Sequence, residues 1–247
     1  MTRLQWIALA LVALLVGILV TAPARLLLPL LPAEQVVVQG LQGSLWRGSA
    51  GAVLVRTSSG FFHLGAVDWR LSPLSLLTLS PGIHFNSEWG QQRLRGYARV
   101  SGADSLTLDD FEGQLSASLA QRFAPVAIDG PLQIQLEALA VEDGLPVSAQ
   151  GRVVWENATF VSRAGPQPLG TYVLLLDSPE DGVMEGEVQT LVGPLTAEGT
   201  AELRGRSYSV TALLRSEGPL YPAIEESLML FAVPRGDTWR VDLEAEI

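Results

Sequence analysis

The sequence predicts a mainly β protein, in which an N-terminal transmembrane helix is followed by an extended antiparallel, twisted β-sheet domain with one or two short helices. Three observations support this fold class. Leu4–Val20 is a run of seventeen residues without a charge. Short segments of alternating apolar and polar residues recur through the rest of the chain. The chain has 24 glycines among its 247 residues, and several of them form turn dipeptides, such as Gly130-Pro131 and Asp143-Gly144, that separate those segments.

The apolar run is long enough to cross a bilayer. At about 1.5 Å per residue it spans roughly 26 Å as a helix, close to a hydrocarbon core of about 30 Å. We therefore predict a transmembrane anchor with a short cytoplasmic tail at residues 1–24, and a linker rich in Pro and Leu at 25–34. A cleaved signal peptide is the alternative, because Ala22-Pro23-Ala24 matches an A-x-A site. The length of the run and the leucines after it favour the retained anchor, and both interpretations export residues 35–247.

The charged residues around the run say little about its orientation, since Arg3 before it and Arg25 after it nearly balance. A short N-terminal tail with a long polar remainder is the usual single-pass arrangement, so we expect the amino terminus in the cytoplasm. The exported part is acidic, because all 26 Asp and Glu residues lie from Glu34 onward. The absence of cysteine fits an oxidising compartment.

Residues 35–247 are predicted to form the β-rich domain. The alternation is clearest at Leu132–Glu137 and Trp239–Ala245, where one face would meet a core and the other water. Similar segments are Gln35–Gln39, Ala52–Thr57, Ala66–Leu71, Arg93–Ser101, Val147–Trp155, Tyr172–Leu176, Val183–Gln189, Leu195–Arg204 and Ser207–Leu214. The domain is therefore expected to be a meander of antiparallel strands.

A weak internal repeat suggests that this domain has two halves. Gly43–Ala50 followed by Leu64-Gly65 resembles Gly151–Ala158 followed by Leu169-Gly170. Two similar halves, 35–125 and 126–247, would explain it, and chance agreement between glycine-rich strands explains it equally well.

Three segments break the alternation. Pro222–Phe231 has apolar residues at i, i+4 and i+7, with Pro222 first and acidic residues in its opening turn, so it predicts a helix. Gln114–Phe123 fits either a helix or a strand. Pro73–Leu79 fits a short helical turn.

Composition excludes several classes of site. All 16 basic residues are arginines, which excludes the P-loop, the lysine Schiff base and the Ser-x-x-Lys nucleophile. Without cysteine there is no disulfide, thiolate zinc site or cysteine nucleophile. The net charge of −10 argues against nucleic-acid binding.

An enzyme would have to be built around His63 and His84, with Asp68 and Glu88 nearby, but these residues follow no recognised spacing. Asp109-Asp110 could suggest the carboxylate pair of a glycoside hydrolase, but adjacent residues of a strand face opposite ways, so we predict a solvated turn there instead. We therefore predict no enzyme activity, no catalytic, cofactor-binding or metal-binding residue, and no small-molecule substrate.

Five tryptophans lie in or beside the predicted strands, and each is predicted to pack in the core, where it would bury about 150–250 Å²: Trp46, Trp69, Trp89, Trp155 and Trp239. Trp46 is the best candidate for an exception, because Gly43 and Gly48 permit a close backbone approach or a bulge. The candidate partner-binding residues are Gly43, Trp46, Gly48 and Trp69.

Gly43-Ser-Leu-Trp46-Arg-Gly-Ser-Ala50, followed by Val67-Asp-Trp69-Arg-Leu71-Ser-Pro73 and a Leu-rich stretch, resembles the general secretion pathway protein N family of bacterial type II secretion systems. With the apolar run, Gly151–Ala158 and Pro222–Phe231, the resemblance spans nearly the whole chain. It implies a single-pass inner-membrane protein, mostly periplasmic, that contacts other components of the secretion system. It implies no catalytic residue and no cofactor.

The expected function is therefore that of a non-enzymatic accessory or assembly component of a type II protein secretion system, acting through protein–protein contacts of its periplasmic domain. Exposed strand edges can recruit partner strands by main-chain hydrogen bonds. The alternative is a periplasmic lipid-handling β-groove protein of envelope biogenesis, which predicts a long curved sheet lined continuously with apolar side chains. An exported hydrolase is a third hypothesis with less support.

Overall fold

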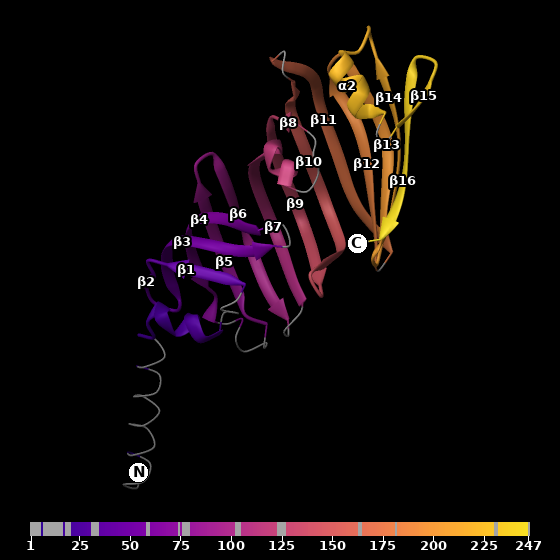
Figure 1. Cartoon of the computed structure of the whole chain (residues 1–247). Coiled ribbons are helices and arrows are strands. Elements are labelled where there is room, and N and C mark those ends of the chain that lie inside the picture. The colour runs from indigo at the N-terminus through magenta and orange to yellow at the C-terminus, as the bar shows by residue number, and fades with distance from the viewer. Residues whose placement is uncertain are drawn as a thin grey trace. The chain divides into compact units, whose positions relative to one another are not determined.

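The structure is a computed structural model that describes residues 6, 17, 21–30, 35–57, 60–73, 75, 80–101, 105–122, 127–162, 165–180, 182–229 and 232–246 (Figure 1). The chain divides into two compact units, Met1–Trp89 (unit 1) and Gly90–Ile247 (unit 2). The two similar halves at 35–125 and 126–247 stay a prediction.

The predicted anchor falls almost entirely outside the described residues, which include only Trp6, Gly17 and Thr21–Ala24 of its range. Among the helices that the structure does describe, none has the length and apolar character needed to cross a bilayer. The predicted linker begins as a 3-10 helix, η1 (Ala24–Leu30), which contains Pro29.

Unit 1 is an antiparallel sheet in the order β1-β3-β4-β5, with β2 paired to β3. Its strands are β1 (Val36–Gln39), β2 (Gln42–Gly43), β3 (Arg47–Thr57), β4 (Gly60–Leu71) and β5 (Gly82–Trp89). Strands predicted at 35–39, 52–57 and 66–71 are confirmed. β5 was not predicted, and of the predicted helical turn at Pro73–Leu79 only residues 73 and 75 are described.

Unit 2 is an antiparallel sheet in the order β6-β7-β9-β10-β11-β12-β13-β14-β16-β15, with β8 paired to β10. Its elements are β6 (Gln92–Ser101), β7 (Ser105–Ser116), η3 (Ala117–Arg122), β8 (Ile128–Asp129), β9 (Pro131–Glu142), β10 (Leu145–Ser162), β11 (Gly165–Glu180), β12 (Val183–Val192), β13 (Leu195–Arg204), β14 (Ser207–Ser216), α2 (Pro222–Leu228), β15 (Ala232–Arg235) and β16 (Thr238–Glu246). The mainly antiparallel β fold with short helices is confirmed.

The irregular segments of unit 2 are partly as predicted. The helix expected at Pro222–Phe231 forms as α2, with Pro222 in its first turn and Glu225 near its start. The ambiguous Gln114–Phe123 is both structures in succession, because β7 runs to Ser116 and the 3-10 helix η3 follows.

The prediction of a solvated turn at Asp109-Asp110 is wrong. Both residues lie inside β7, where the register against β6 shifts between Arg95 and Tyr97. Asp110 takes a positive φ of 48°, and Asp109 forms an ion pair with Arg99 at 2.8 Å. A bulge places an extra residue on one strand, so adjacent acidic residues need not end the strand.

Alternation gives the sheet of unit 2 one apolar and one acidic face. The pairing aligns Leu176, Gly186, Ala201, Val210 and Leu243 in one row from β11 to β16. The neighbouring row on the opposite face aligns Asp177, Glu185, Glu202, Ser209 and Glu244. Because successive side chains of a strand point to opposite faces, these rows define an apolar face and an acidic face.

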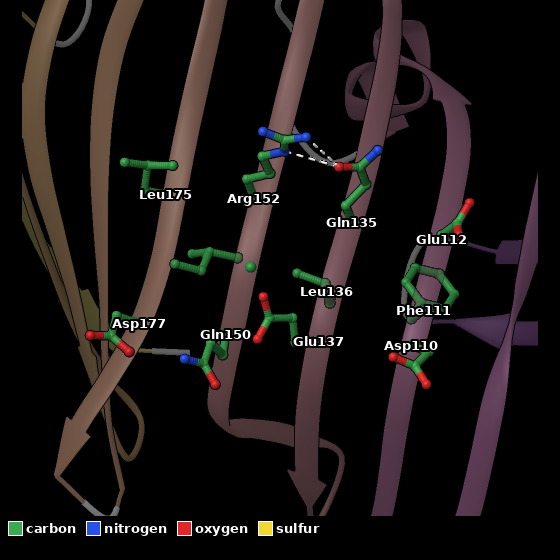
Figure 2. A pocket seen from close by; sticks show the side chains of 12 residues that line it. Asp110, Phe111, Glu112, Gln135, Leu136, Glu137, Gln150, Arg152, Leu175 and Asp177 are labelled. Carbon is green, nitrogen blue, oxygen red and sulfur yellow. Dashed lines mark hydrogen bonds between the residues drawn. The ribbon is translucent and has the colours of Figure 1, made fainter.

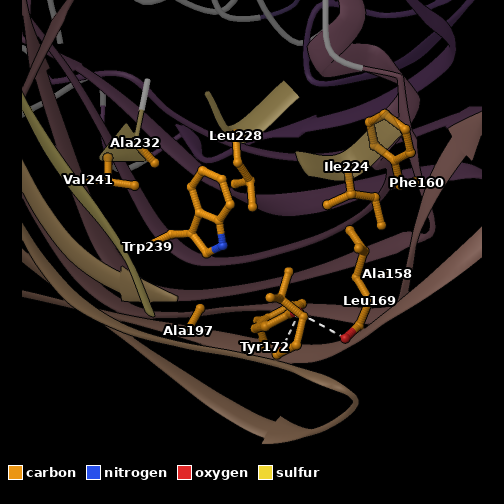
Figure 3. Close-up of a cluster of buried hydrophobic side chains, with 11 residues drawn as sticks. Ala158, Phe160, Leu169, Tyr172, Ala197, Ile224, Leu228, Ala232, Trp239 and Val241 are labelled. Carbon is orange, nitrogen blue, oxygen red and sulfur yellow. Dashed lines mark hydrogen bonds between the residues drawn. The ribbon is translucent and has the colours of Figure 1, made fainter. Parts of the chain in front are cut away.

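The core of unit 2 lies where α2 packs against strand side chains (Figure 3). Its members come from six elements: Ala158, Phe160, Leu169, Tyr172, Leu195, Ala197, Ile224, Leu228, Ala232, Trp239 and Val241. Ile224 and Leu228, four residues apart on α2, lie on one face of the helix and are both buried.

Candidate interaction site

The candidate residues of unit 1 gather around a tight turn between β2 and β3. Gly43 pairs with Gly48, and the turn is closed by the Ser44 N–H, which donates to the Arg47 carbonyl at 2.8 Å. The Arg47 N–H in turn donates to Ser44 Oγ at 3.1 Å. Gly43 has φ +83°, a conformation that side chains disfavour. Glycine is therefore required where the chain enters this turn.

The indole of Trp69 lies directly on Gly48. The β3–β4 register places these two residues opposite each other. A Cβ atom on residue 48 would collide with the Trp69 ring, and would come within 2.7 Å of the Gln42 carbonyl oxygen. Trp69 Nε1 donates to the Leu45 carbonyl at 3.2 Å, so the ring also holds the turn by a hydrogen bond.

Trp46 completes the group within the same turn. Its side chain is half-buried, and its carbonyl accepts a hydrogen bond from the Leu71 N–H at 2.9 Å. The structure thus brings Gly43, Trp46, Gly48 and Trp69 together at one turn.

The turn also holds the last residues of the range predicted for the anchor. The Leu45 N–H donates to the Ala22 carbonyl at 2.8 Å, and Ser44 forms a β-bridge with Pro23. Ala22 and Ala24 are both buried. The turn therefore fixes the start of unit 1 to its sheet by backbone contacts.

The two histidines around which an enzyme would be built lie far apart. His84 lies opposite Arg70, seven residues along β4 from His63, which is about 20 Å of extended strand. Asp68 lies opposite Asn86, and Glu88 opposite Ala66. In the described part of the chain, no three His, Cys, Asp or Glu side chains are placed to hold a metal ion.

The tryptophans differ in burial, so the prediction that each packs in the core holds only in part. Trp239 is buried, whereas Trp46, Trp69 and Trp155 are half-buried. Trp89 is 52% exposed and stacks on His63 with ring centroids 5.3 Å apart, so core packing is wrong for it.

The acidic face of unit 2 was missed by the sequence analysis. Its signal was present, because acidic residues occupy alternate positions in the last strands of the chain. A hollow of about 710 Å³ is lined by Asp110, Glu112, Glu137 and Asp177 among others. Figure 2 shows how these side chains lie. Arg152 from β10 is the cation of this lining, and its guanidinium donates to Gln135 Oε1 at 2.9 and 2.8 Å.

Two carboxylates of the acidic face have arginine partners on their own strand. Arg204 contacts Glu202 at 3.1 Å, and Arg240 Nε donates to Asp242 Oδ2 at 2.6 Å. That hydrogen bond from Arg240 lowers the pKa of Asp242 below its ordinary value.

Tyr172 is the buried titratable group of the core. Its hydroxyl lies 2.7 Å from the Leu195 carbonyl and 3.0 Å from the Leu169 carbonyl, joining β13 to β11. Burial raises its pKa to about 12, so it is neutral at physiological pH.

Comparison with known proteins shows which family has this sequence. A family model described as type II secretion system (T2SS), protein N matches residues 34–241, which include the turn of unit 1 and nearly all of unit 2. The chain belongs to the type II secretion system protein N family. The resemblance seen in Gly43–Ala50 and Val67–Pro73 is thereby confirmed.

A relative of the family is similar along most of its length. The chain is 30% identical over 238 residues to the type II secretion system protein N of Vibrio cholerae serotype O1 (strain ATCC 39315 / El Tor Inaba N16961), covering 90% of each chain. No solved structure matches. By its family, the chain is therefore a component of a type II secretion system, and its role is in protein transport.

Proposed function

We propose that the chain is a non-enzymatic accessory or assembly component of a type II secretion system, held in the bacterial inner membrane with its β units in the periplasm. The match of the family model over residues 34–241 carries this proposal. Its partners are other components of the secretion system, reached through protein–protein contacts. Extended sheets with open edges suit that role, because binding through backbone groups requires no reactive side chain.

Secretion in a deletion strain tests the proposal. The strain should accumulate the exported proteins in the periplasm, and the intact gene should restore their release. Unchanged secretion without the protein would contradict the proposal.

The proposed topology can be tested with single cysteines, since the natural chain has none. Glu217→Cys lies on an exposed segment of unit 2, and Thr2→Cys lies before the apolar run. A membrane-impermeant maleimide applied to cells with a permeable outer membrane should label position 217 and spare position 2. The reverse pattern would overturn the periplasmic location.

We further propose that the surface around Gly43, Trp46, Gly48 and Trp69 contacts a partner. A photo-crosslinking residue at exposed Arg47, which closes the turn at the start of β3, should capture a secretion component. The matched control is the same residue at exposed Arg56 on β3. Equal capture at both positions would argue against a site at the turn.

A lipid-handling groove is the second candidate, and the family comparison does not favour it. One observation speaks for it: the apolar face of unit 2 continues in register from Leu176 to Leu243. If this face holds lipid, mass spectrometry of the purified chain should find acyl lipids, and Ala201→Glu in the middle of the row should remove them. Thr200→Glu, on the opposite face, is the control and should retain the same lipids.

A further inference from the structure

The last long strand of unit 2 has an edge that is only half covered. Along one side, β14 pairs with the whole of β16, from Ser207↔Glu246 to Arg215↔Thr238. Along the other side, β15 pairs with Thr238–Val241. Within the described residues no strand pairs with 242–246 on that side, and all five of these residues are exposed (Figure 1). We call these five residues the open edge.

The covered and open parts of this border differ in chemistry. β15 is four residues long and contains Pro234, which has no N–H to donate, and it ends with Arg235. Short length, proline and charged side chains are features by which natural sheets block pairing at an edge. The open edge has no proline, and its three charged residues are all acidic, so they repel an acidic strand and not a basic one. It therefore keeps the main-chain donors and acceptors that an added strand needs.

Side chains of the open edge alternate in character. Asp242, Glu244 and Glu246 belong to the acidic face, and Leu243 and Ala245 to the apolar face. Asp242 is already hydrogen-bonded to Arg240. Glu244 and Glu246 lie opposite Ser209 and Ser207, so their cross-strand neighbours on β14 provide no cation. A strand on the free side is where a cation can meet these two carboxylates.

We propose that the open edge binds an extended segment of a partner protein as an added strand, in which Lys or Arg alternates with apolar residues. The basic side chains would lie opposite Glu244 and Glu246, where opposite charges on neighbouring strands are stabilising. The apolar side chains would continue the face formed by Leu243 and Ala245. This inference rests on the proposed function, because it names the chemistry of the partner with which a secretion component would assemble.

A second copy of this chain does not fit the open edge. When two such edges pair antiparallel with their acidic faces aligned, each of residues 242, 244 and 246 lies opposite another carboxylate. Like charges in directly opposed positions destabilise strand pairing. The charge pattern therefore selects a basic strand from another protein.

A designed peptide can test the added strand. The probe is acetyl-Arg-Val-Arg-Val-Arg-Val-Arg-amide with a fluorescent label, titrated with the purified chain 1–247 and followed by anisotropy. N-methylation of the three valines removes the N–H groups along one border of the peptide, and N-methylation of three arginines removes those along the other. Strand addition uses one border, so one methylated peptide should lose at least tenfold in affinity and the other less than threefold. Equal losses would overturn the proposal.

Charge reversal locates the peptide on the protein. Glu244→Arg should weaken binding of the basic peptide at least tenfold. Glu185→Arg is the matched control, because it makes the same change of charge on the acidic face, three strands away from β16. Equal weakening by both variants would show attraction by diffuse charge and would overturn a site at the open edge.

Hydrogen exchange provides a readout that needs no variant. Binding of the basic peptide should slow exchange of the amides on the free side of 242–246, and should leave those of β12 unchanged. Unchanged exchange at 242–246 with bound peptide would overturn the proposal. If the deletion strain is defective in secretion but the peptide does not bind at the edge, this inference alone fails. If the peptide binds there and secretion does not need the chain, the proposed function fails.

Discussion

The two units of the molecule keep their strands in place by different means. In unit 1 most of the buried apolar side chains near the β2–β3 turn are small: Ala22, Ala24 and Ala50 lie there beside the larger Leu71. The turn there is fixed by backbone hydrogen bonds and by one indole lying on a glycine. In unit 2 large side chains gather under α2, and Trp239, Tyr172 and Phe160 are the largest of them.

This difference separates two ways in which a sheet can resist distortion. A cluster of large side chains derives its stability from apolar area removed from water, so it is sensitive to truncation. A turn held mainly by backbone hydrogen bonds, with a ring packed directly on glycine, is sensitive to volume added at that glycine. The two units should therefore respond to opposite kinds of substitution.

The largest effect is expected from truncation in unit 2. Trp239→Ala removes the central ring of the α2 cluster and should destabilise unit 2 by about 3–5 kcal/mol. Urea unfolding followed by far-ultraviolet circular dichroism measures this. Trp89→Ala is the control, because that ring is 52% exposed and makes a single described stacking contact, with His63, so about 1 kcal/mol is expected. Similar losses from the two substitutions would mean that the α2 cluster is not the main support of unit 2.

Added volume should be costly in unit 1. Gly48→Ala pushes its Cβ into Trp69 and into the Gln42 carbonyl, and should destabilise unit 1 by about 1–3 kcal/mol. Gly51→Ala on the same strand is the matched control, because its Cβ would meet nothing closer than 3.8 Å and the residue has no positive φ. That substitution should be neutral or slightly stabilising. Protease resistance and thermal unfolding of the purified chain distinguish the two variants, and equal stability would contradict the close approach of Trp69.

A smaller effect is expected where a buried hydroxyl joins two strands of unit 2. Tyr172→Phe removes the hydrogen bonding to the Leu169 and Leu195 carbonyls and should cost about 1 kcal/mol at neutral pH. The folded state raises the pKa of Tyr172 from 10.0 to about 12, so the folded state holds this proton more tightly than the unfolded chain does. The contribution is complete below pH 10 and is lost as pH rises through 12.

The stability difference between the natural chain and Tyr172→Phe should therefore shrink between pH 10 and 12. Chemical denaturation at several pH values measures it. Tyr221→Phe is the control, since that side chain is 52% exposed. A difference that stays constant across this range would contradict the burial of the Tyr172 hydroxyl.

Much of the fold was predictable because alternation is a local property of a strand. The strands that were missed have residues that break it for a structural reason. In β5 the expected apolar position is Ser87, which is 1% exposed and donates its hydroxyl to the Leu64 carbonyl at 2.6 Å. In β7 the bulge at Asp109-Asp110 imitates a turn. A pattern of period two cannot predict a buried polar residue that bonds to the backbone. It cannot predict a bulge either.

The candidate sites show the same limit. The residues of the unit 1 turn could be picked from the sequence because glycine and tryptophan are distinctive, but the contact between Gly48 and Trp69 depends on register across 21 residues. The acidic face arises from residues that are ordinary one by one. It becomes a feature only when β11 to β16 align Asp177, Glu185, Glu202 and Glu244. The open edge exists because β15 stops pairing with β16 at Val241, and no local sequence pattern predicts where that pairing ends.

The smallest expected effect concerns the ion pair next to the open edge. Arg240→Gln removes the hydrogen bond that lowers the pKa of Asp242, so that pKa should rise toward its ordinary value. Because the folded-state pKa of this carboxylate is lowered, its contribution to stability is present above the unfolded value and is lost as pH falls below about 4. A carboxyl-detected nuclear magnetic resonance titration of Asp242 measures the shift directly. Arg204→Gln, which removes the partner of Glu202 instead, should leave the Asp242 titration unchanged. If both variants shift Asp242 equally, its pKa is set by the summed charge of the acidic face and not by Arg240, and Asp242 would then be as available as Glu244 and Glu246 to an incoming basic strand.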